Sequence, residues 1–531
     1  MPATLEVWVA DRQRQIVAQF LVSSVFVASA LATLGAAEPV DDAIVARIKT
    51  EGFQHSAVMD TLSWLSDVNG PRLTGSPGLR RAAEWARDQM TRWGLAHAAL
   101  EAYATTFRGW TLQRLELSMA TPQYVRITGY PLAWSPSTKG PVAGTPIVVV
   151  VQSKDDFATY HGKLRGAIVM NGRPDALPLG FEPEATRLTD QDLARQAAAI
   201  NPSPPGMEDD APPSLAAEDE DFAEDMSKHL EIAKFFAAEG VAAVVTASSI
   251  REAVRVQGFY DNLWQSPYPQ FVFSREHYGR IVRMLDRKVP VTLSIDLDVA
   301  FTPPAPGFNV VAEIPGTDPQ IGQQVVMLGA HLDSWHAATG ATDNGAGSAA
   351  VMEAMRILQA IGVKPRRTIR VALWSGEEQD YYGSTGYVEQ HFADLKTGER
   401  KPEHAQLAAY FNLDNGSGRI RGVNLQGNEA VRPIFEAWLR PFAYLGATTL
   451  TTLNTGGTDH MVFNAAGLPG FQFLQDPLDY ETRVHHSSLD GYENASSDDL
   501  MQASVILASF AYNAAMRDDM LPRPASEKTG K

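Results

Sequence analysis

Residues 325–333 read VVMLGAHLD and residues 369–378 read IRVALWSGEE, and each is an apolar run that ends in acidic or histidine side chains. A helical pattern begins between them at about Asn344, with apolar residues at the i, i+3, i+4, i+7 spacing of a buried stripe. Buried strands that alternate with helices predict a mainly parallel sheet covered on both faces, which is a doubly wound α/β fold. The predicted strands are 325–330, 369–374, 407–412 and 470–474.

Polar side chains gather where these strands end. Ligands of open α/β sheets bind in the crevice beyond the carboxyl ends of the strands, so we expect these side chains to converge on one site. A single Asp or His at a strand end is more often a turn or capping residue. The ordered series after successive strands indicates a functional site instead. Its members are His331, Asp333, Asp343, Glu377, Glu378, Asp414, His485 and His486.

The residue types in this series favour a metal site. The chain has no cysteine, which excludes disulfides, thiolate catalysis and cysteine-type zinc sites. Imidazoles with carboxylates suit zinc or another first-row divalent ion, and one carboxylate can bridge two ions. Glu377 and Glu378 are expected to differ in role, because successive residues of an extended segment point to different sides. The predicted metal ligands are His331, Asp343, Glu378, Asp414 and His486.

Composition and charge narrow the class of protein. With 44% hydrophobic residues the 531-residue chain is globular, and 45 Lys and Arg against 62 Asp and Glu give a net charge of −17. That charge disfavours nucleic acid and anionic membranes as partners. Arg12 and Arg14, the apolar run 20–34 and the small residues 35–37 follow signal-peptide order, so we expect export and a mature chain that begins near Glu38. An uncleaved anchor is the alternative.

The pattern of predicted secondary structure changes along the chain. Residues 40–115 have a helical, amphipathic pattern, whereas short β-rich runs from about Leu117 to Leu297 suggest an inserted α/β or β-rich domain. Pro and acidic residues in 201–225 indicate a solvated loop within it. The predicted organisation is 1–37 signal peptide, 38–116 first part of the main domain, 117–297 insertion, 298–516 second part of the main domain and 517–531 tail.

Several motifs resemble a known family, the co-catalytic zinc aminopeptidases and glutamate carboxypeptidases, and most of all its plasma-type glutamate carboxypeptidase branch. The insertion looks like a protease-associated domain. The resemblance therefore implies a zinc-exopeptidase domain with an inserted β-rich protease-associated domain. The motifs are GPRLTGSPG (70–78), GAHLDSW (329–335), ATDNGAG (341–347), SGEEQ (375–379), FNLD (411–414), GGTDHMVF (456–463), HHSSLD (485–490) and, in the insertion, LRGAIVMNG (164–172) and FFAAEGVAAVVTASS (235–249).

The resemblance also implies roles for the metal ligands. One zinc ion would be held by His331 and Asp414 and the other by Glu378 and His486, with Asp343 bridging the two. The choice of His486 over His485 rests on the family spacing to Asp490.

Three further residues receive catalytic roles from the same resemblance. Glu377 would be the general base, Asp333 would orient the zinc histidine, and His485 would take the oxyanion role of a tyrosine found there in many members. The family pattern Glu-Glu-x-Gly-Leu-x-Gly-Ser is also altered, because residues 377–384 read EEQDYYGS.

The expected function is that of a secreted two-zinc exopeptidase. It would cut the N-terminal residue of peptides or split dipeptides through a metal-bound water and Glu377. The alternatives are a carboxypeptidase with Arg483 as the carboxylate anchor, a two-metal deacylase or cyclase, and an inactive binding relative. We expect a peptide substrate and neither nucleic acid nor a stable membrane association after signal removal, and a homodimer stays open.

Overall fold

The computed structural model describes residues 38–174, 176–177, 179–200, 202, 220–258 and 266–524. The predicted signal peptide 1–37 and most of the predicted acidic loop 201–225 lie outside these residues, but the end of that loop is helical because α7 begins at Glu220. Among the described residues, none of the helices has both the length and the apolar character that a membrane crossing needs.

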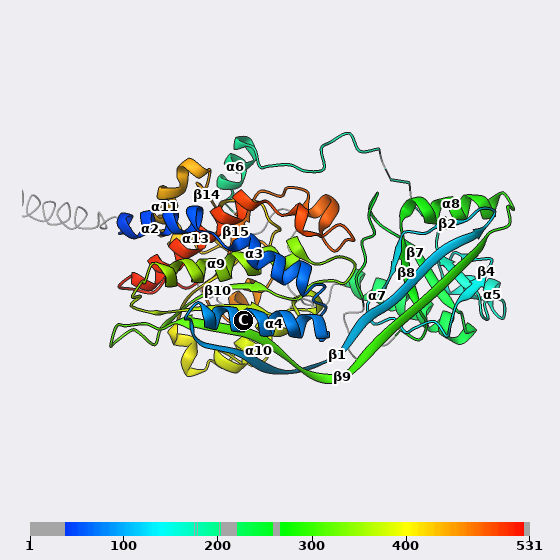
Figure 1. Cartoon of the computed structure of the whole chain (residues 1–531), viewed down its shortest axis with the longest axis horizontal. Helices are drawn as coiled ribbons and strands as arrows, with labels where there is room; N and C mark the ends of the chain where they lie inside the picture. The colour runs from blue at the N-terminus through cyan, green and yellow to red at the C-terminus, as the bar shows by residue number, and fades with distance from the viewer. Residues whose placement is uncertain are drawn as a thin grey trace, which may run out of the picture. The chain divides into compact units, whose positions relative to one another are not determined.

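A large mixed sheet forms the centre of the fold (Figure 1). Its middle is parallel, since β10 pairs with β11 and β12, and β12 pairs with β15. These are the four strands predicted from sequence, each confirmed to within one residue at either end. The strand order is β14 (Thr449–Thr451), β13 (Ile420–Asn424), β15 (Gly470–Gln475), β12 (Leu407–Asn412), β10 (Val325–His331), β11 (Thr368–Trp374), β9 (Thr292–Ile314), β1 (Ala96–Thr121) and β2 (Val125–Arg126), with β4 (Val142–Gly144) also on β9.

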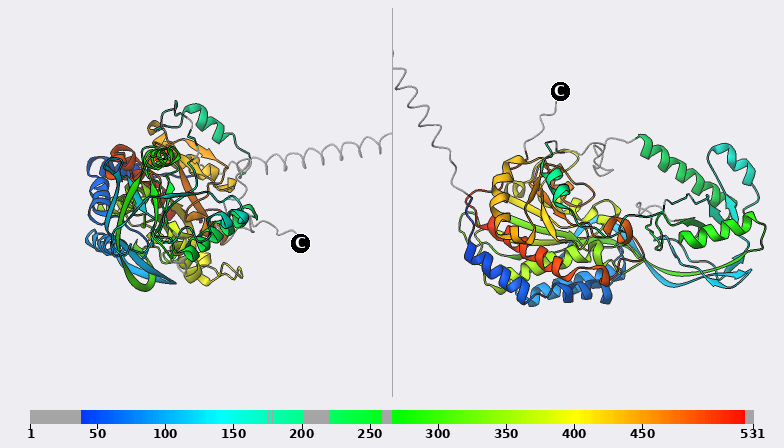
Figure 2. Two further views of the ribbon diagram at one scale, coloured as in Figure 1. Left: turned by 90° about the vertical axis from the view of Figure 1, so that its right-hand side faces the viewer. Right: turned by 90° about the horizontal axis from the view of Figure 1, so that it is seen from above.

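Helices cover both faces of this sheet, as the doubly wound prediction requires. Successive residues of β12 show the two faces: the Tyr410 ring stacks on Phe463 of α12 at 4.0 Å, whereas Phe411 meets Phe510 of α13 at 5.7 Å. The predicted helix from about Asn344 is α9, and Figure 2 (right) shows α2 running beside α13. The helices here are α2 (Asp42–Gln54), α3 (Val58–Ser63), α4 (Pro77–Arg92), α9 (Ala346–Ala360), α10 (Tyr382–His391), α11 (Arg432–Leu439), α12 (His460–Ala465) and α13 (Ser497–Met516).

A long two-stranded ribbon, made of β1 and β9, joins the large sheet to a second one (Figure 1). Its antiparallel register runs from Ala96 opposite Glu313 to Thr121 opposite Thr292. The helical prediction for 40–115 is therefore wrong from Ala96 onward. Ala, Leu and Glu in this stretch favour a helix in isolation, but pairing with a distant strand decides the structure. The predicted insertion boundaries at 117 and 297 fall inside these two strands.

The second sheet has five strands, with helices on both faces. The far ends of β1 and β9 pack with α8 on one face, through Leu117, Leu293 and Tyr278, and α7 covers the other face through Phe236. Helices and strands both contribute, so this part is of the α/β kind. Its strand order is β3 (Gly129–Pro131), β8 (Gln270–Phe273), β7 (Ala243–Ala247), β6 (Ile168–Asn171) and β5 (Ile147–Val149), and its helices are α5 (Phe157–Tyr160), α7 (Glu220–Glu239) and α8 (Arg275–Asp286).

One stretch of the predicted insertion packs on the main domain instead. Helix α6 (Asp190–Ala197) contacts β14, and Arg187 just before it reaches two buried carboxylates. Its guanidinium lies 2.8 Å from Asp476 and 2.7 Å from Asp499, whose side chains are 0% and 2% exposed. Arg187 therefore ties this stretch to the edge of the large sheet.

Loss of that tie should destabilise the protein. We expect Arg187→Ala to lower the free energy of unfolding by about 1–3 kcal/mol, because it removes a partner of two buried charges. The loss stays below that of a fully buried pair, since the Arg187 side chain is 41% exposed and Arg421 still pairs with Asp476. Denaturant unfolding measures the effect. The matched control is Arg195→Ala, which removes a surface pair with Asp192 and should change stability little; equal losses would contradict the proposed tie.

Candidate metal centre and active site

The polar residues at the strand ends meet in one cavity of about 630 Å³. Seven of the eight predicted site residues line it, and Asp333 is the exception. His331 ends β10, Asp414 follows β12, and the glutamates follow β11 in a 3-10 turn, Glu377–Gln379. The sequence thus predicted the convergence correctly. The predicted residues on its wall are His331, Asp343, Glu377, Glu378, Asp414, His485 and His486.

Asp343 lies at the centre of this group. One carboxylate oxygen, Oδ1, is 3.3 Å from Nε2 of His331, and the other, Oδ2, is 3.2 Å from Nε2 of His486. The backbone N–H of Asp343 donates to Asp490 at 3.1 Å, which fixes the loop that carries it. A carboxylate with one oxygen toward each imidazole has the arrangement of a bridge between two ions.

Each histidine also faces a second carboxylate. Nε2 of His331 lies 3.4 Å from Asp414, and Nε2 of His486 lies 3.0 Å from Glu378. Two ligand atoms bound about 2.0–2.1 Å from a tetrahedral zinc ion are about 3.3 Å apart. The separations between these side chains therefore fit metal ligation as well as direct ion pairs.

Two carboxylate oxygens of the candidate metal centre lack a hydrogen-bond donor. Oε1 of Glu378 is buried and makes no hydrogen bond, and Oδ1 of Asp414, also buried and without a hydrogen bond, has His331 Nε2 only at 3.4 Å. A buried charged acceptor left without a partner costs free energy, and a bound cation removes that cost. Burial, with Asp343 nearby, raises the pKa of Glu378 to about 7, and for His486 the carboxylates outweigh burial and raise the pKa to about 10. The donor set fits two divalent ions.

Glu377 and Glu378 point to different partners, as predicted. The prediction assumed that the two residues lie in an extended segment, and that assumption is wrong. The segment is a 3-10 turn and not extended. Glu378 reaches His486 at 3.0 Å, while Oε2 of Glu377 stays 3.9 Å from Nε2 of His331. Burial raises the pKa of Glu377 well above its usual value. Glu377 is thus the cavity glutamate that is farther from an imidazole.

Asp333, the predicted histidine-orienting residue, lies beside His331 through both its backbone carbonyl and its carboxylate. Nδ1 of His331 donates to the backbone carbonyl of Asp333 at 3.1 Å, whereas the Asp333 carboxylate is 3.6 Å away. That carboxylate accepts from Thr74 at 2.7 Å and from the backbone N–H groups of Glu377 and Glu378 at 3.4 Å each. Its side chain therefore holds the glutamate turn, and its backbone orients the histidine.

His485 lies at the rim of the cavity. Its ring stacks on Tyr480 at 4.7 Å, its Nδ1 lies 3.2 Å from Glu481, and its Nε2 is 3.8 Å from Asp343. His485, His486 and Asp343 have ligand atoms close enough together to hold one metal ion. Tyr480 also lines the cavity and was not predicted from the sequence.

The cavity wall is acidic. Among the described residues that line it there is no Lys or Arg, whereas Asp380 and Glu481 add to the carboxylates already named. Arg483, the alternative carboxylate anchor, is not part of the wall and pairs with Glu184 at 3.2 Å and Asp479 at 3.5 Å. Wall residues that were not predicted from the sequence include Tyr480, Gln257 and Tyr381, and Asp380 of the altered motif 377–384 also lines the wall.

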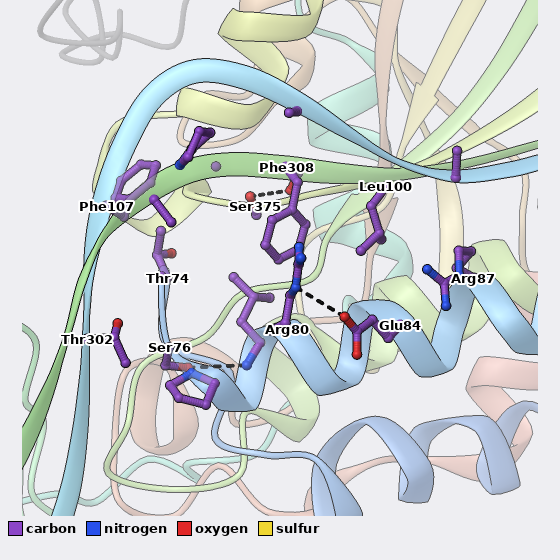
Figure 3. A pocket seen from close by; sticks show the side chains of 18 of the residues that line it. Thr74, Ser76, Arg80, Glu84, Arg87, Leu100, Phe107, Thr302, Phe308 and Ser375 are labelled. Carbon is purple, nitrogen blue, oxygen red and sulfur yellow. Dashed lines mark hydrogen bonds and ion pairs between the residues drawn. The ribbon is translucent and has the colours of Figure 1, made fainter.

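A second cavity of about 930 Å³ lies between α4 and the β1–β9 ribbon (Figure 3). Arg80 lies over the Phe308 ring there and pairs with Glu84 at 3.1 Å. None of the predicted metal ligands lines it. Its wall includes Thr74, which donates a hydrogen bond to Asp333, and Ser375, which lies two residues before the glutamate turn.

A mainly parallel α/β sheet with paired imidazole and carboxylate groups at its carboxyl edge defines a class, the metal-dependent hydrolases. Residues 309–511, the part of the chain that carries all eight predicted site residues, match the model of peptidase family M28. The predicted resemblance and the predicted enzyme class, a metallopeptidase, are confirmed.

Relatives extend the likeness beyond this region. Carboxypeptidase Q of Mus musculus is 26% identical over 92% of this chain and 91% of its own length. A peptidase M28 precursor from Shewanella amazonensis has the same fold, with a TM-score of 0.63, 23% identity, and coverage of 91% of this chain and 98% of its own. The zinc aminopeptidase BSAP from Bacillus subtilis gives 0.55 at 19% identity, covering 87% and 95%.

Proposed function

We propose that this protein is a secreted two-zinc exopeptidase that removes the N-terminal residue of peptides or splits dipeptides. The observation that carries the proposal is Asp343, with one oxygen toward each of two imidazoles. Zinc is the metal of the similar BSAP, and it suits nitrogen and oxygen ligands with open positions. Export rests on the signal-like composition of residues 1–37 and on no structural observation.

Five residues would hold the two ions. His331 and Asp414 would bind one and Glu378 and His486 the other, with Asp343 shared between them. When bound, the ions supply the Lewis acidity that lowers the pKa of a water molecule and polarises the scissile carbonyl. Glu377 is not needed as a ligand and takes the proton of the attacking water, which it then returns to the leaving amine.

The acidic wall favours a substrate with a free amino group. A protonated α-amine pairs with carboxylates, whereas recognition of a substrate carboxylate calls for Arg or Lys. Asp380 supplies such a carboxylate: it lines the cavity, and its Oδ1 is buried without a hydrogen bond. Its φ of +101° is a conformation that suits glycine, the residue of the family pattern at this position. A strained Asp in place of Gly is consistent with a functional side chain.

The carboxypeptidase alternative keeps one specific support, the likeness to proteins named carboxypeptidase Q along most of the chain. In that reading Arg483 would have to leave Glu184 and Asp479 to reach a substrate carboxylate.

A comparison of two substrates separates these readings. We expect an aminoacyl amide with a free amine to be cleaved in preference to an N-acetylated peptide with a free carboxyl end. Asp380→Gly should lower kcat/KM for the first substrate by about 10- to 100-fold, the value of one charge-assisted contact. Its melting temperature should not fall, because glycine accepts this φ. Preference for the acetylated peptide, with Asp380→Gly unaffected, would overturn the aminopeptidase assignment and point to Arg483.

A further inference from the structure

A segment of the chain beside the second sheet reaches into the metal site. Residues 254–257 pair with residues 485–488, the segment that carries the two adjacent histidines. Val256 N–H donates to the carbonyl of His486 at 3.0 Å, and Ser488 N–H donates to the carbonyl of Val254 at 2.9 Å. Arg255 and Ser487 form the bridge between them, and Arg255 Nε donates to the carbonyl of His485 at 3.1 Å. The histidine segment is therefore held from outside the main domain.

This pairing stabilises an uncommon backbone conformation. His486 has a φ of +55°, in the left-handed region that is unfavourable for residues other than glycine. Hydrogen bonds to the backbone carbonyls of His485 and His486 stabilise that conformation. The direction in which the His486 ring points thus depends on residues 254–257.

The side chain of Gln257 contacts the ring itself. Its amide lies 2.9 Å from Nδ1 of His486, while Nε2 on the other side of the ring faces Asp343 and Glu378. An imidazole that gives the lone pair of Nε2 to a metal carries its proton on Nδ1 and needs an acceptor there. The atom that lies 2.9 Å from Nδ1 in this structure is the amide nitrogen of Gln257. A half-turn of the amide exchanges its nitrogen and oxygen, and Oε1 in that place is the acceptor that a metal-bound imidazole needs.

We propose that Gln257 is a positioning residue for the ion held by His486 and Glu378, so that the inserted part of the chain completes one of the two metal positions. The other position is independent of it. Nδ1 of His331 has its acceptor next to it in the chain, the carbonyl of Asp333 at 3.1 Å. A change at Gln257 should therefore weaken one ion and leave the other bound.

The inference rests on the proposed two-metal function, and its test reads metal binding directly. We expect Gln257→Leu to weaken the second ion by about 10- to 100-fold, the usual effect of losing such a partner, while the first ion stays bound. Gln257→Glu keeps an acceptor of the same length and should restore the affinity. Dialysis of the full-length protein against graded chelator buffers, followed by elemental analysis, gives the two affinities. The absorption spectrum of the cobalt-loaded protein reports the changed ligand geometry.

A matched control lies within the main domain. Gln426 makes the same kind of contact, 2.6 Å from Nε2 of His460, a buried histidine outside the ligand set whose pKa is lowered by burial to about 4. Gln426→Leu should leave both metal affinities unchanged. Wild-type protein that binds no metal would refute the proposed function itself. Wild-type protein with two ions and Gln257→Leu with the same two affinities would refute only the role of Gln257, as would an equal loss in Gln257→Glu.

Discussion

Replacement of Glu377 by Gln should abolish most turnover and leave the metal content intact. Glu377 lines the cavity and is 3.9 Å from the nearest imidazole nitrogen, so its loss leaves the proposed ligand set complete. A general base contributes about 10²–10⁴-fold, and kcat should fall by that amount with KM little changed. Steady-state kinetics with the aminoacyl amide and elemental analysis of the same preparation measure the two effects.

Glu378→Gln is the control for this prediction. It changes the adjacent residue in the same turn, but Glu378 lies 3.0 Å from Nε2 of His486 and has a second oxygen without a partner. Metal content should therefore fall in this variant. If both variants lose metal equally, the division of roles between the two glutamates is wrong.

Asp343→Asn should have the second large effect, the loss of both ions. Each Asp343 oxygen faces a different histidine, so one substitution weakens both positions. Loss of a residue that only hydrogen-bonds a metal ligand typically lowers the affinity by about 10- to 100-fold. We expect both affinities to fall by more than this, because Asp343 is proposed to bind the ions directly. Activity should be lost with the metal and should return in part at high zinc concentration.

His331→Ala is the control variant, because it removes a ligand of only one of the two proposed ions. Chelator titration should show one weakened ion in His331→Ala and two in Asp343→Asn. Asp343→Asn protein that keeps one ion at its original affinity would contradict the bridging role.

The sequence was enough to predict the part of the fold that carries the chemistry. Strands β10, β11, β12 and β15 are short, apolar and buried, so local composition identifies them. The convergence of their polar ends follows from the general geometry of parallel sheets, so the cluster around Asp343 was predictable from the sequence.

The sequence was not enough where distant segments decide the structure. The Ala-rich start of β1 has a helical composition, and only its partner β9 makes it a strand. Gln257 has no motif of its own and lies far in sequence from His486, so its contact with the ring could not be inferred. The strand-end carboxylate Asp333 was identified, but the choice between its side chain and its backbone carbonyl needed the atomic distances.

The β1–β9 ribbon also affects how the chain is made and folded. Its two strands pair along most of their length, although the whole second sheet lies between them in the sequence. Such pairing must close a long loop before it gains any stabilisation, which slows folding. During synthesis β1 emerges well before β9, and its edge stays open to other strands until its partner arrives. Chaperone binding to the segment of β1 is therefore expected while the chain is incomplete, and conditions that slow translation between the two strands should increase aggregation.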